Sequence, residues 1–408
     1  MDFDTDIAIV GGGLNGTTLA LALALAGQRV TLIDKLAVKA RKNAAFDGRS
    51  YAMALTSTRL MTGVGVWDAL APTAQPMLDI KVTDGRVGSG PSPFFMHFDH
   101  AEIEEGPMGY MIEDRHLRPA LLAAVAQHKG IHRIEGTGVV DQTVLPAGIR
   151  LTLDTGAQIT ARLAVGADGR GTGVGARAGI KRTEWAYGQT ALVCAIEHDL
   201  PHHGVAHQFF MPPGPLAILP LSGNRSSIVW SETAANAAAI NSLSDKDYIE
   251  VLRPRFGSFL GDIRLKGARY TYPLGLSLAH EMVAGRVALL GDAAHGVHPI
   301  AGQGLNAGLR DVAALAEVVA DAARRGDDIG GDTTLLQYQT WRRFDNTALA
   351  LATDSFNRLF SNDNPIVRAA RNVGMAAVNA LPGVRRSFMR EAAGLTGDLP
   401  RLLRGEAL

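Results

Sequence analysis

The chain has 408 residues, 47% of them hydrophobic and 20% charged, which is more than one hydrophobic core usually serves, so we expect two closely packed domains. Its 40 basic and 40 acidic side chains cancel, which argues against a nucleic-acid partner. The single cysteine, Cys194, excludes an internal disulfide and a cysteine-type zinc site, and we predict no metal site. It also favours a reducing, cytoplasmic location, and no apolar run approaches the roughly 18 residues of a membrane span.

The first motif along the chain is a dinucleotide-binding fingerprint. An apolar strand leads into GGGLNG at 11–16, an alanine/leucine helix follows, and a second strand ends at Asp34. In this context the glycines permit the turn, let backbone approach a pyrophosphate and let the helix pack on the strand, while the carboxylate accepts hydrogen bonds from a ribose. The motif does not distinguish NAD from FAD. The glycines in these three roles are Gly11, Gly13 and Gly16.

The next segments alternate loops with short apolar runs. A loop carries Arg49, and Arg115 precedes an amphipathic helix over 117–127. A buried strand at 161–165 ends in Asp168-Gly169.

Between residues 190 and 272 the pattern changes to strands and turns. The clearest hairpin joins 216–221 to 226–230, and one capped helix, 248–256, interrupts the strands. We therefore predict an α/β fold: a Rossmann-like parallel sheet with an inserted, mostly antiparallel β domain and a C-terminal helical region. The expected boundaries are 1–78, 106–180 and 276–330 for the dinucleotide domain, 79–105 and 181–275 for the inserted domain, and 331–408 for the helical region.

The stretch 286–315 combines a buried strand, Gly291-Asp292 and a glycine-rich turn with Gly302 and Gly304. A helix over 304–320 follows, and its amino end would stabilise an anion such as the N1–C2=O edge of a reduced flavin. The alternative is that Asp292 merely caps a tight turn. A long helix over 333–360 comes next, and from Pro365 onward seven arginines stand against three acidic residues.

Conspicuous glycines or a glycine–carboxylate pair thus follow a buried strand at three places, which we call stations: Gly11–Gly16, Asp168-Gly169 and Gly291-Asp292. Three such stations fit one long ligand. The chain resembles class A flavoprotein aromatic monooxygenases of the p-hydroxybenzoate hydroxylase fold, and more closely the ubiquinone-biosynthesis hydroxylases of the UbiH/UbiF/VisC type. The resemblance covers nearly the whole chain. Its most specific matches are FDGR at 46–49, GYMIEDRHLRPAL at 109–121, GPLAILPL at 214–221 and HPIAGQGLN at 298–306.

The resemblance implies FAD as cofactor and NAD(P)H as co-substrate. Thr172 and Gly175 stand where the family often has serine and arginine, so no nicotinamide-binding residue is carried over. The implied FAD contacts are Gly11, Gly13, Gly16, Asp34, Arg49, Arg115, Asp168, Gly169, Gly291, Asp292, Gly302, Gln303, Gly304, Leu305 and Asn306.

The implied reaction is reduction of FAD, addition of O₂ at flavin C4a and transfer of one oxygen from the hydroperoxide to an electron-rich phenol ring. Pro299 would border the oxygen site, and His295 or His298 could relay a proton, although structural histidines are commoner. Leu216, Ile218 and Trp230 are candidates for the substrate pocket, with ordinary core as the favoured alternative.

The resemblance implies a polyprenylated phenol as substrate with O₂, in ubiquinone biosynthesis. The rivals are a flavin hydroxylase of a small soluble phenol and a low-turnover FAD-binding scaffold of a biosynthetic complex. The basic C-terminal region could touch the inner membrane peripherally or meet other ubiquinone-biosynthesis proteins. A solvated or homodimer-packing helix is the favoured alternative there. The motifs leave open the ring position (C1, C5 or C6) and the choice between NADH and NADPH.

Overall fold

The computed structural model describes residues 3–37, 45–88, 90–171, 173–299, 302–361 and 364–408. Its first large sheet has a parallel core, with the strand order β18, β11, β1, β2, β8. A short antiparallel strand, β17, extends one edge, and the hairpin β9–β10 pairs beside β11. The bounds are β1 Thr5–Val10, β2 Val30–Asp34, β8 Ile131–Glu135, β9 Val139–Leu145, β10 Gly148–Leu153, β11 Gln158–Gly166, β17 Val283–Ala284 and β18 Val287–Leu289.

Helices cover this parallel sheet and bury its apolar side chains. The short α1 is apolar on nearly every side and almost wholly buried, as the alanine/leucine sequence predicts. The long α8 turns one apolar face toward α1 and the sheet. Helices around this sheet are α1 Leu14–Leu25, α4 Asp114–Gln127, α5 Val174–Arg177, α8 Gln303–Arg325 and α9 Asp332–Phe360.

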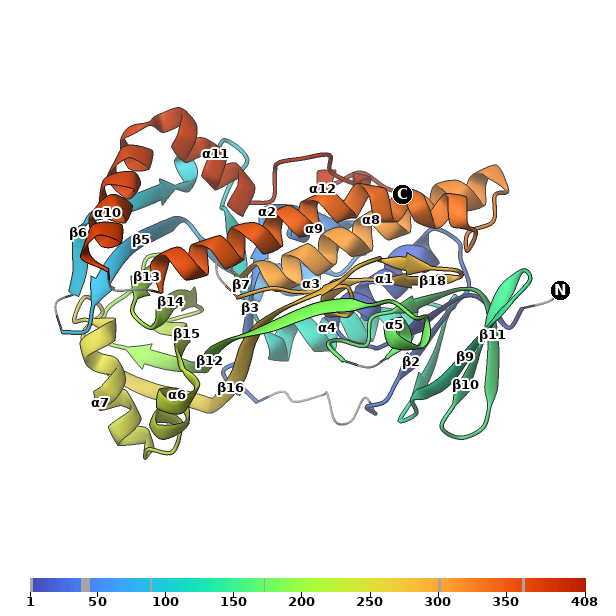
Figure 1. The fold of residues 1–408 in the computed structure, drawn as a ribbon, viewed down its shortest axis with the longest axis horizontal. Helices are drawn as coiled ribbons and strands as arrows, with labels where there is room; N and C mark the ends of the chain where they lie inside the picture. The colour runs from blue at the N-terminus through green and yellow to red at the C-terminus, as the bar shows by residue number, and fades with distance from the viewer. Residues whose placement is uncertain (1–2, 38–44, 89, 172, 300–301, 362–363) are drawn as a thin grey trace.

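The second large sheet is mostly antiparallel, in the order β19, β16, β12, β15, β14, β13, β5, β6. Helices α6 and α7 pack on one of its faces at the end of the molecule remote from the N-terminus (Figure 1). The bounds are β5 Asp79–Arg86, β6 Gly90–Asp99, β12 Arg182–His198, β13 Val205–Met211, β14 Gly214–Leu221, β15 Arg225–Thr233, α6 Ala234–Asn241, α7 Asp245–Phe256, β16 Ile263–Ala279 and β19 His295–Gly296.

A small sheet and two short helices connect the large sheets. In this small sheet β7 lies between β3 and β4. Its residue Met111 joins one apolar cluster with Ala195 and Leu221 of the second large sheet. The bounds are β3 Ser50–Ala54, α2 Leu55–Gly63, α3 Trp67–Leu70, β4 Gln75–Met77 and β7 Gly109–Glu113.

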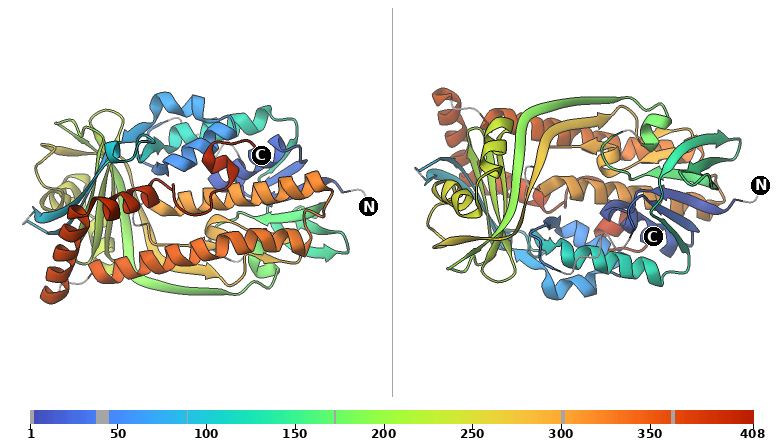
Figure 2. Two further views of the ribbon diagram at one scale, coloured as in Figure 1. Left: turned by 90° about the horizontal axis from the view of Figure 1, so that it is seen from above. Right: turned by 90° about the horizontal axis from the view of Figure 1, so that it is seen from below.

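Helices α8 and α9 run side by side along the length of the molecule, and the long strands β12 and β16 join its two halves (Figure 2). Beyond α9, α10 (Pro365–Ala380) and α11 (Pro382–Ala392) pack over β6, and α12 (Arg401–Arg404) returns to α2. In the part of the chain that the structure describes, no helix is both long and apolar enough to cross a membrane. The architecture confirms the predicted parallel sheet, antiparallel insertion and helical C-terminal region.

Candidate active site

The three glycine-and-carboxylate stations meet at one edge of the parallel sheet. Val10 pairs with Gly166, which in turn pairs with Leu289, so β1, β11 and β18 end in register. The loops continue this contact, because Ala167 N–H donates to the Val10 carbonyl (2.8 Å) and Leu290 N–H donates to the Gly166 carbonyl (3.1 Å). Ligands of open α/β sheets bind at such an edge.

The fingerprint glycines divide between packing and open space. A Cβ at Gly16 would lie 1.9 Å from the Gly11 carbonyl oxygen, so this glycine lets α1 pack on the turn. A Cβ at Gly13 would meet nothing within 4 Å. No side chain caps the start of α1, and its first turn carries no acidic residue. The open N–H groups and positive dipole end there suit a pyrophosphate.

Asp34 ends β2 beside the same turn. Its Oδ1 accepts a hydrogen bond from Leu36 N–H (2.8 Å), and the residue is 9% exposed. A shallow pocket opens next to it between β2 and β8, lined by Gly12, Leu32, Asp34, Leu36, Leu122, Arg133, Ile134 and Glu135. Asp34 thus stands at the position where the carboxylate of such a fingerprint accepts hydrogen bonds from a ribose.

The start of α8 resembles the start of α1. Its N-cap is Gly302, in the left-handed conformation (φ 63°), and neither a capping side chain nor an acidic residue occupies the first turn. A Cβ at Gly304 would meet nothing within 4 Å, whereas a Cβ at Gly302 would lie 2.8 Å from Ala52 Cβ. The helix start at Gly304, next to the half-buried Leu305, therefore offers open space to a ligand.

Asn306 is fully occupied within the protein. Its Oδ1 accepts from Ala54 N–H (2.9 Å) and from the Ser57 hydroxyl (2.9 Å), and its Nδ2 donates to the carbonyls of Ala52 (3.0 Å) and Gly302 (3.0 Å). In this arrangement Asn306 fixes the start of α8 against β3 and α2.

Asn15 links the first and third stations, a contact that the sequence did not indicate. A Cβ at Gly291 would lie 2.4 Å from its Nδ2, and one at Gly308 2.2 Å from it, so both glycines make room for this side chain. The buried Asn15 Oδ1 has no hydrogen-bond donor among the described residues. A ribityl chain has hydroxyls that could donate to it, and this orphaned acceptor is one observation that fits FAD.

Asp292 lies at the surface of this edge, with its side chain 48% exposed and 3.3 Å from Arg170 Nε. Its backbone belongs to the short 3-10 helix Gly291–Ala293. Arg182, from β12, donates to the carbonyls of Asp292 (3.4 Å) and Ala293 and so ties this turn to the second sheet. Arg170 donates to Oδ2 of this exposed carboxylate, which can also receive hydroxyl donors from a ligand.

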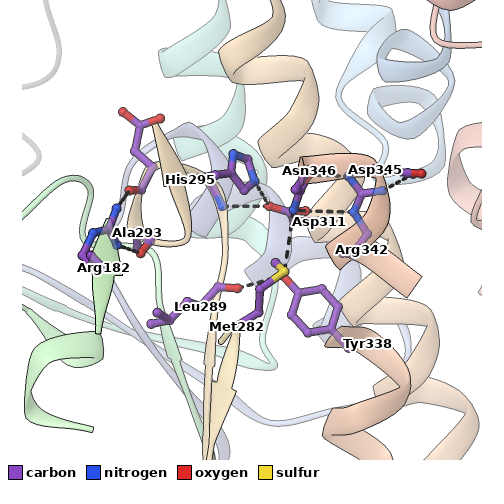
Figure 3. Close-up of polar contacts among 12 residues, drawn as sticks. Arg182, Met282, Leu289, Ala293, His295, Asp311, Tyr338, Arg342, Asp345 and Asn346 are labelled. Atoms are coloured by element: carbon purple, nitrogen blue, oxygen red, sulfur yellow. Dashed lines mark hydrogen bonds and ion pairs between the residues drawn. The ribbon is translucent and has the colours of Figure 1, made fainter. Parts of the chain in front are cut away.

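The carboxylate of Asp311, on α8, is fully buried and fixes the turn Gly291–Ala293 from the interior of the protein (Figure 3). Gly291 N–H donates to its Oδ2 (3.0 Å), and His295 Nε2 lies 2.5 Å from the same oxygen. Its Oδ1 accepts from Arg342 Nε (2.9 Å) and Asn346 Nδ2 (3.1 Å) on α9. Burial alone would raise the pKa of Asp311, but His295 and Arg342 outweigh burial and lower it, so the carboxylate stays ionised.

His295 is thus 3% exposed and turned toward Asp311, an arrangement that suits a positioning role. Tyr338 completes the group by donating its hydroxyl to the Leu289 carbonyl (2.8 Å) at the end of β18. Sequence reasoning missed Asp311, Arg342, Asn346 and Tyr338. The available signal was an acidic residue within the apolar face of the predicted helix after Gly304.

His298 is fully buried, and neither ring nitrogen has a partner in the described part of the chain. Burial lowers its pKa to about 4, so the ring is neutral near pH 7. Its ring meets Tyr187 edge to face at a centroid distance of 5.4 Å. Pro299 follows it and accepts a hydrogen bond from Gly302 N–H (3.1 Å), while Ile300 and Ala301 lie outside the described residues.

The two predicted cofactor arginines have separate partners. Arg49 lies 2.7 Å from Asp47 and 3.4 Å from Asp114, with its guanidinium over the Tyr270 ring. Arg115 Nε donates to Glu113 (2.6 Å), and its guanidinium covers the Phe46 ring. The structure therefore brings Arg49 next to the second sheet and places Arg115 in a different ion pair.

Asp168 braces its own loop, because its Oδ2 accepts from Val174 N–H at the start of α5 (2.9 Å). A small pocket opens beside Asp168-Gly169 and reaches Arg182 and Ala293 near the third station. Thr172 of this loop lies outside the described residues.

Strand register decides which face of the second sheet could meet a substrate. Leu216 pairs with Trp230, and these two residues and Ile218 are 0–1% exposed in the core cluster under α6 and α7. Their burial matches the alternative that they are ordinary core. The neighbouring row, on the opposite face, runs through Tyr270, Val193, Val229 and Ala217. Tyr270 contacts Arg49, so this row faces the cofactor domain.

The fold and this edge together define a flavoprotein of the aromatic-monooxygenase type. The family model described as "FAD binding domain" matches residues 4–350, and the chain belongs to that family. It is accordingly an FAD-dependent monooxygenase.

Individual relatives resemble the chain over almost its whole length. It is 44% identical to "Ubiquinone hydroxylase UbiL" of Rhodospirillum rubrum, over 99% of this chain and 93% of that protein. It is 33% identical to the "3-demethoxyubiquinol 3-hydroxylase" of Escherichia coli, over 96% and 99%. Among solved structures, p-nitrophenol 4-monooxygenase PnpA from Pseudomonas putida shares the fold with a TM-score of 0.79 at 20% identity, covering 97% of this chain and 99% of that one.

Proposed function

We propose that the protein hydroxylates the aromatic ring of a polyprenylated phenol in ubiquinone biosynthesis, using FAD, NAD(P)H and O₂. The observation that carries this proposal is the meeting of three stations and two uncapped helix starts at one sheet edge, in a chain 44% identical to a named ubiquinone hydroxylase. An edge of this kind fits an extended dinucleotide, with its pyrophosphate at one helix start and a ring that becomes anionic on reduction at the other.

The residues at this edge fit FAD in a definite order. Asp34 and its pocket would hold the adenosine, and Gly11, Gly13 and the start of α1 the pyrophosphate. Asp292 and Asn15 would hold the ribityl chain, and 302–306 would lie against the flavin's pyrimidine edge. We also propose FAD contacts for Arg49, Arg115 and Asp168-Gly169. The two arginines would have to leave their present ion-pair partners to make these contacts.

When bound, FAD would accept electrons from NAD(P)H and activate O₂ for transfer of one oxygen atom to the ring. The chain's own tasks are to orient the phenol, exclude water and stabilise negative charge at the flavin's pyrimidine edge through the start of α8. Pro299 would border the oxygen site. The row containing Tyr270, Val193, Val229 and Ala217 would form the wall against which the ring packs.

A polyprenyl tail must leave a membrane or a carrier, so the C-terminal region bears on function. Six of its seven arginines form ion pairs, most of them with acidic residues of other elements, and only Arg386 has no ion pair among the described residues. Among the described residues of this region, unpaired basic charge is therefore limited to Arg386. We infer that any membrane contact is mainly apolar and uses the exposed Val373, Leu381, Val384 and Phe388.

Quinone-intermediate analysis in cells lacking the protein tests the proposal directly. We expect an under-hydroxylated prenylphenol to accumulate, and an unchanged quinone profile would contradict the proposal. With purified protein, a phenol that stimulates oxygen-dependent NAD(P)H oxidation would exclude a low-turnover scaffold. A short-chain prenylphenol should be preferred over 4-hydroxybenzoate, and the reverse preference would favour a soluble substrate.

A further inference from the structure

Four half-exposed side chains form a row across the second sheet, on the face opposite α6 and α7. The row, which we call the open row, consists of paired residues on four adjacent strands: Val193, Val229, Ala217 and Gln208. Paired residues of a sheet point to the same face, and their neighbours along each strand point to the other face. Phe209 and Trp230 are such neighbours, and both lie in the core under α7. The open row therefore continues the face on which Tyr270 lies, toward the cofactor domain.

The open row lies between two buried rows of the same face. On β12, β13 and β15 the residues two positions before and after its members are only 0–4% exposed: Ala191, Ala195, Ala206, Phe210, Ser227 and Ser231. On β13, Ala206 packs in one cluster with Met77 and Met111 of the small sheet, and Phe210 stacks on Phe360 of α9 with a centroid distance of 4.0 Å. The small sheet and the end of α9 thus cover this face on either side and leave the open row accessible between them.

The open row adjoins the start of α8. Ala52 of β3 packs against the cluster that contains Ala206 and Met111, and its carbonyl accepts a hydrogen bond from Asn306 Nδ2 (3.0 Å). A Cβ at Gly302 would lie 2.8 Å from Ala52 Cβ, so the N-cap of α8 is in close contact with the same strand. Because we propose that the flavin's pyrimidine edge lies at this helix start, an aromatic ring packed on the open row would be next to the cofactor.

Gln208 is the polar member of the open row. Beyond it the pairing continues through two apolar residues, Val82 and Met96. At the other end Tyr270 shares a side-chain hydrogen bond with Asp47. Within the described part of the chain, the Gln208 carboxamide has no hydrogen-bond partner. A carboxamide both donates and accepts hydrogen bonds, so Gln208 can bind an oxygen substituent of a ring on this face.

We propose that Gln208 determines substrate specificity by forming a hydrogen bond with the phenol oxygen of the bound ring. The inference rests on the proposed function, since it requires a phenol as substrate. Before the ring binds, a half-exposed carboxamide can bond to water, and a ring that covers it displaces that water. The phenol oxygen restores the lost hydrogen bond. A ring without this oxygen leaves the carboxamide unpaired, and an unpaired polar group is a strong source of discrimination between similar ligands.

The neighbours of Gln208 suit this role. Pairing with Ala217 on one side and Val82 on the other fixes its backbone in the interior of the sheet. Groups held on strands are positioned more precisely than groups on loops. Ala217 has the smallest side chain of the open row, so the ring can approach the carboxamide from that side, with Val229 as the next apolar contact.

Equilibrium dialysis of the FAD-loaded protein, without NAD(P)H, tests the inference with two ligands. The unmodified protein should bind a short-chain prenylphenol about tenfold more tightly than the prenylbenzene of the same chain length. Gln208→Met keeps the length of the side chain but removes its hydrogen-bonding groups. It should weaken binding of the prenylphenol about tenfold and leave binding of the prenylbenzene and the FAD content unchanged. A role limited to packing would weaken both ligands alike.

Gln158→Met is the matched control, because Gln158 is an exposed glutamine at the start of β11 in the other large sheet. It should change neither affinity. Gln208→Asn, which keeps the carboxamide but withdraws it from the ring, should lose part of the preference.

Two kinds of failure are distinguishable. The role of Gln208 alone would be overturned if Gln208→Met kept the preference or weakened both ligands alike, or if the unmodified protein bound the two ligands equally. If the unmodified, FAD-loaded protein bound no prenylphenol, the proposed function would be contradicted together with this inference.

Discussion

At the scale of single residues, the most consequential group is the buried Asp311 with its partners on α9. Four donors converge on this carboxylate, and one of them is the backbone N–H of Gly291, next to Asp292. A buried ion pair of this kind contributes little net stability compared with apolar packing, but it is costly to break. Its effect here is to fix the backbone that presents Asp292.

Replacing Asp311 should therefore destabilise the fold strongly. Asp311→Ala removes the buried partner of His295 and leaves the buried Arg342 with Asp345 as its remaining ion-pair partner, and we expect a loss of about 3–5 kcal/mol in the free energy of unfolding. Denaturant unfolding measures this loss. Asp321→Ala on the same helix removes a partly exposed carboxylate and should cost less than about 1 kcal/mol. Similar losses in the two variants would contradict the role given to Asp311.

Asp292 should act on FAD affinity and not on folding, since its carboxylate is half exposed. We expect Asp292→Ala to weaken FAD binding by about 10–100-fold, the range for loss of hydrogen bonds to a charged group, with unfolding almost unchanged. Titration of apoprotein with FAD measures the change, with Asp327→Ala on the loop after α8 as the control. Full retention of FAD affinity would remove Asp292 from the site.

His298 should make stability depend on pH. Its pKa is lowered from 6.5 to about 4 in the folded protein, so folding is favoured most when the ring is neutral in both states, above about pH 6.5. This contribution, about 2–4 kcal/mol, is lost as the pH falls from 6.5 toward 4. As the pH is lowered across this window, the free energy of unfolding should fall less steeply for His298→Leu than for the unmodified protein. Equal slopes in the two proteins would contradict this account.

At the scale of elements, strand alternation in the second sheet separates stability from substrate binding. Leu192→Ala, in the row under α7, should lower the free energy of unfolding by about 2–5 kcal/mol and leave KM unchanged. Val193→Phe, in the row that faces Arg49, should raise KM for a prenylphenol by about tenfold while FAD content stays normal. Steady-state kinetics and denaturant unfolding measure both effects in both variants. If the two faces were assigned wrongly, Leu192→Ala would change KM and Val193→Phe would not.

Part of the arrangement of elements could be predicted from the sequence. The fingerprint, the strand before Asp292 and helix α9 follow from local patterns, and the structure has each within a few residues of its predicted bounds. Alternation places Leu216 and Ile218 on one face of their strand, but the pairing of Trp230 with Leu216 and the covering of that face by α7 are known only from the structure. The Asp311 group escaped for a similar reason, because Arg342 lies 31 residues away on another helix.

At the scale of the whole molecule, charge cannot be judged from one segment. The C-terminal arginines look like a basic surface in the sequence, but Arg371 and Arg385 pair with Asp84 and Glu102, each more than 280 residues earlier in the chain. What the segment leaves exposed is the apolar edge of α10 and α11.

Membrane binding, where it occurs, should therefore depend little on salt. We expect flotation with vesicles of anionic and zwitterionic lipid to persist at high ionic strength, and Val384→Ser with Phe388→Ser to reduce it about tenfold or more. Phe344→Ser, which removes an exposed phenylalanine from α9, is the control. Binding abolished by salt would contradict an apolar contact, and concentration-dependent dimerisation lost in the double variant would assign this surface to a second copy.

The order of strands in the parallel sheet also affects how the protein is made. β11 and β18 are neighbours, but the whole of β12–β16 is synthesised between them, and α8 follows later still. A growing chain on the ribosome thus carries the proposed adenosine end of the cofactor site long before Asp292 and the start of α8 exist. Such contacts between distant segments slow folding. FAD should consequently bind late, after the inserted β domain and the segments that follow it have been synthesised. In protein made without enough flavin, we expect β18, α8 and α9 to be the least stably folded elements.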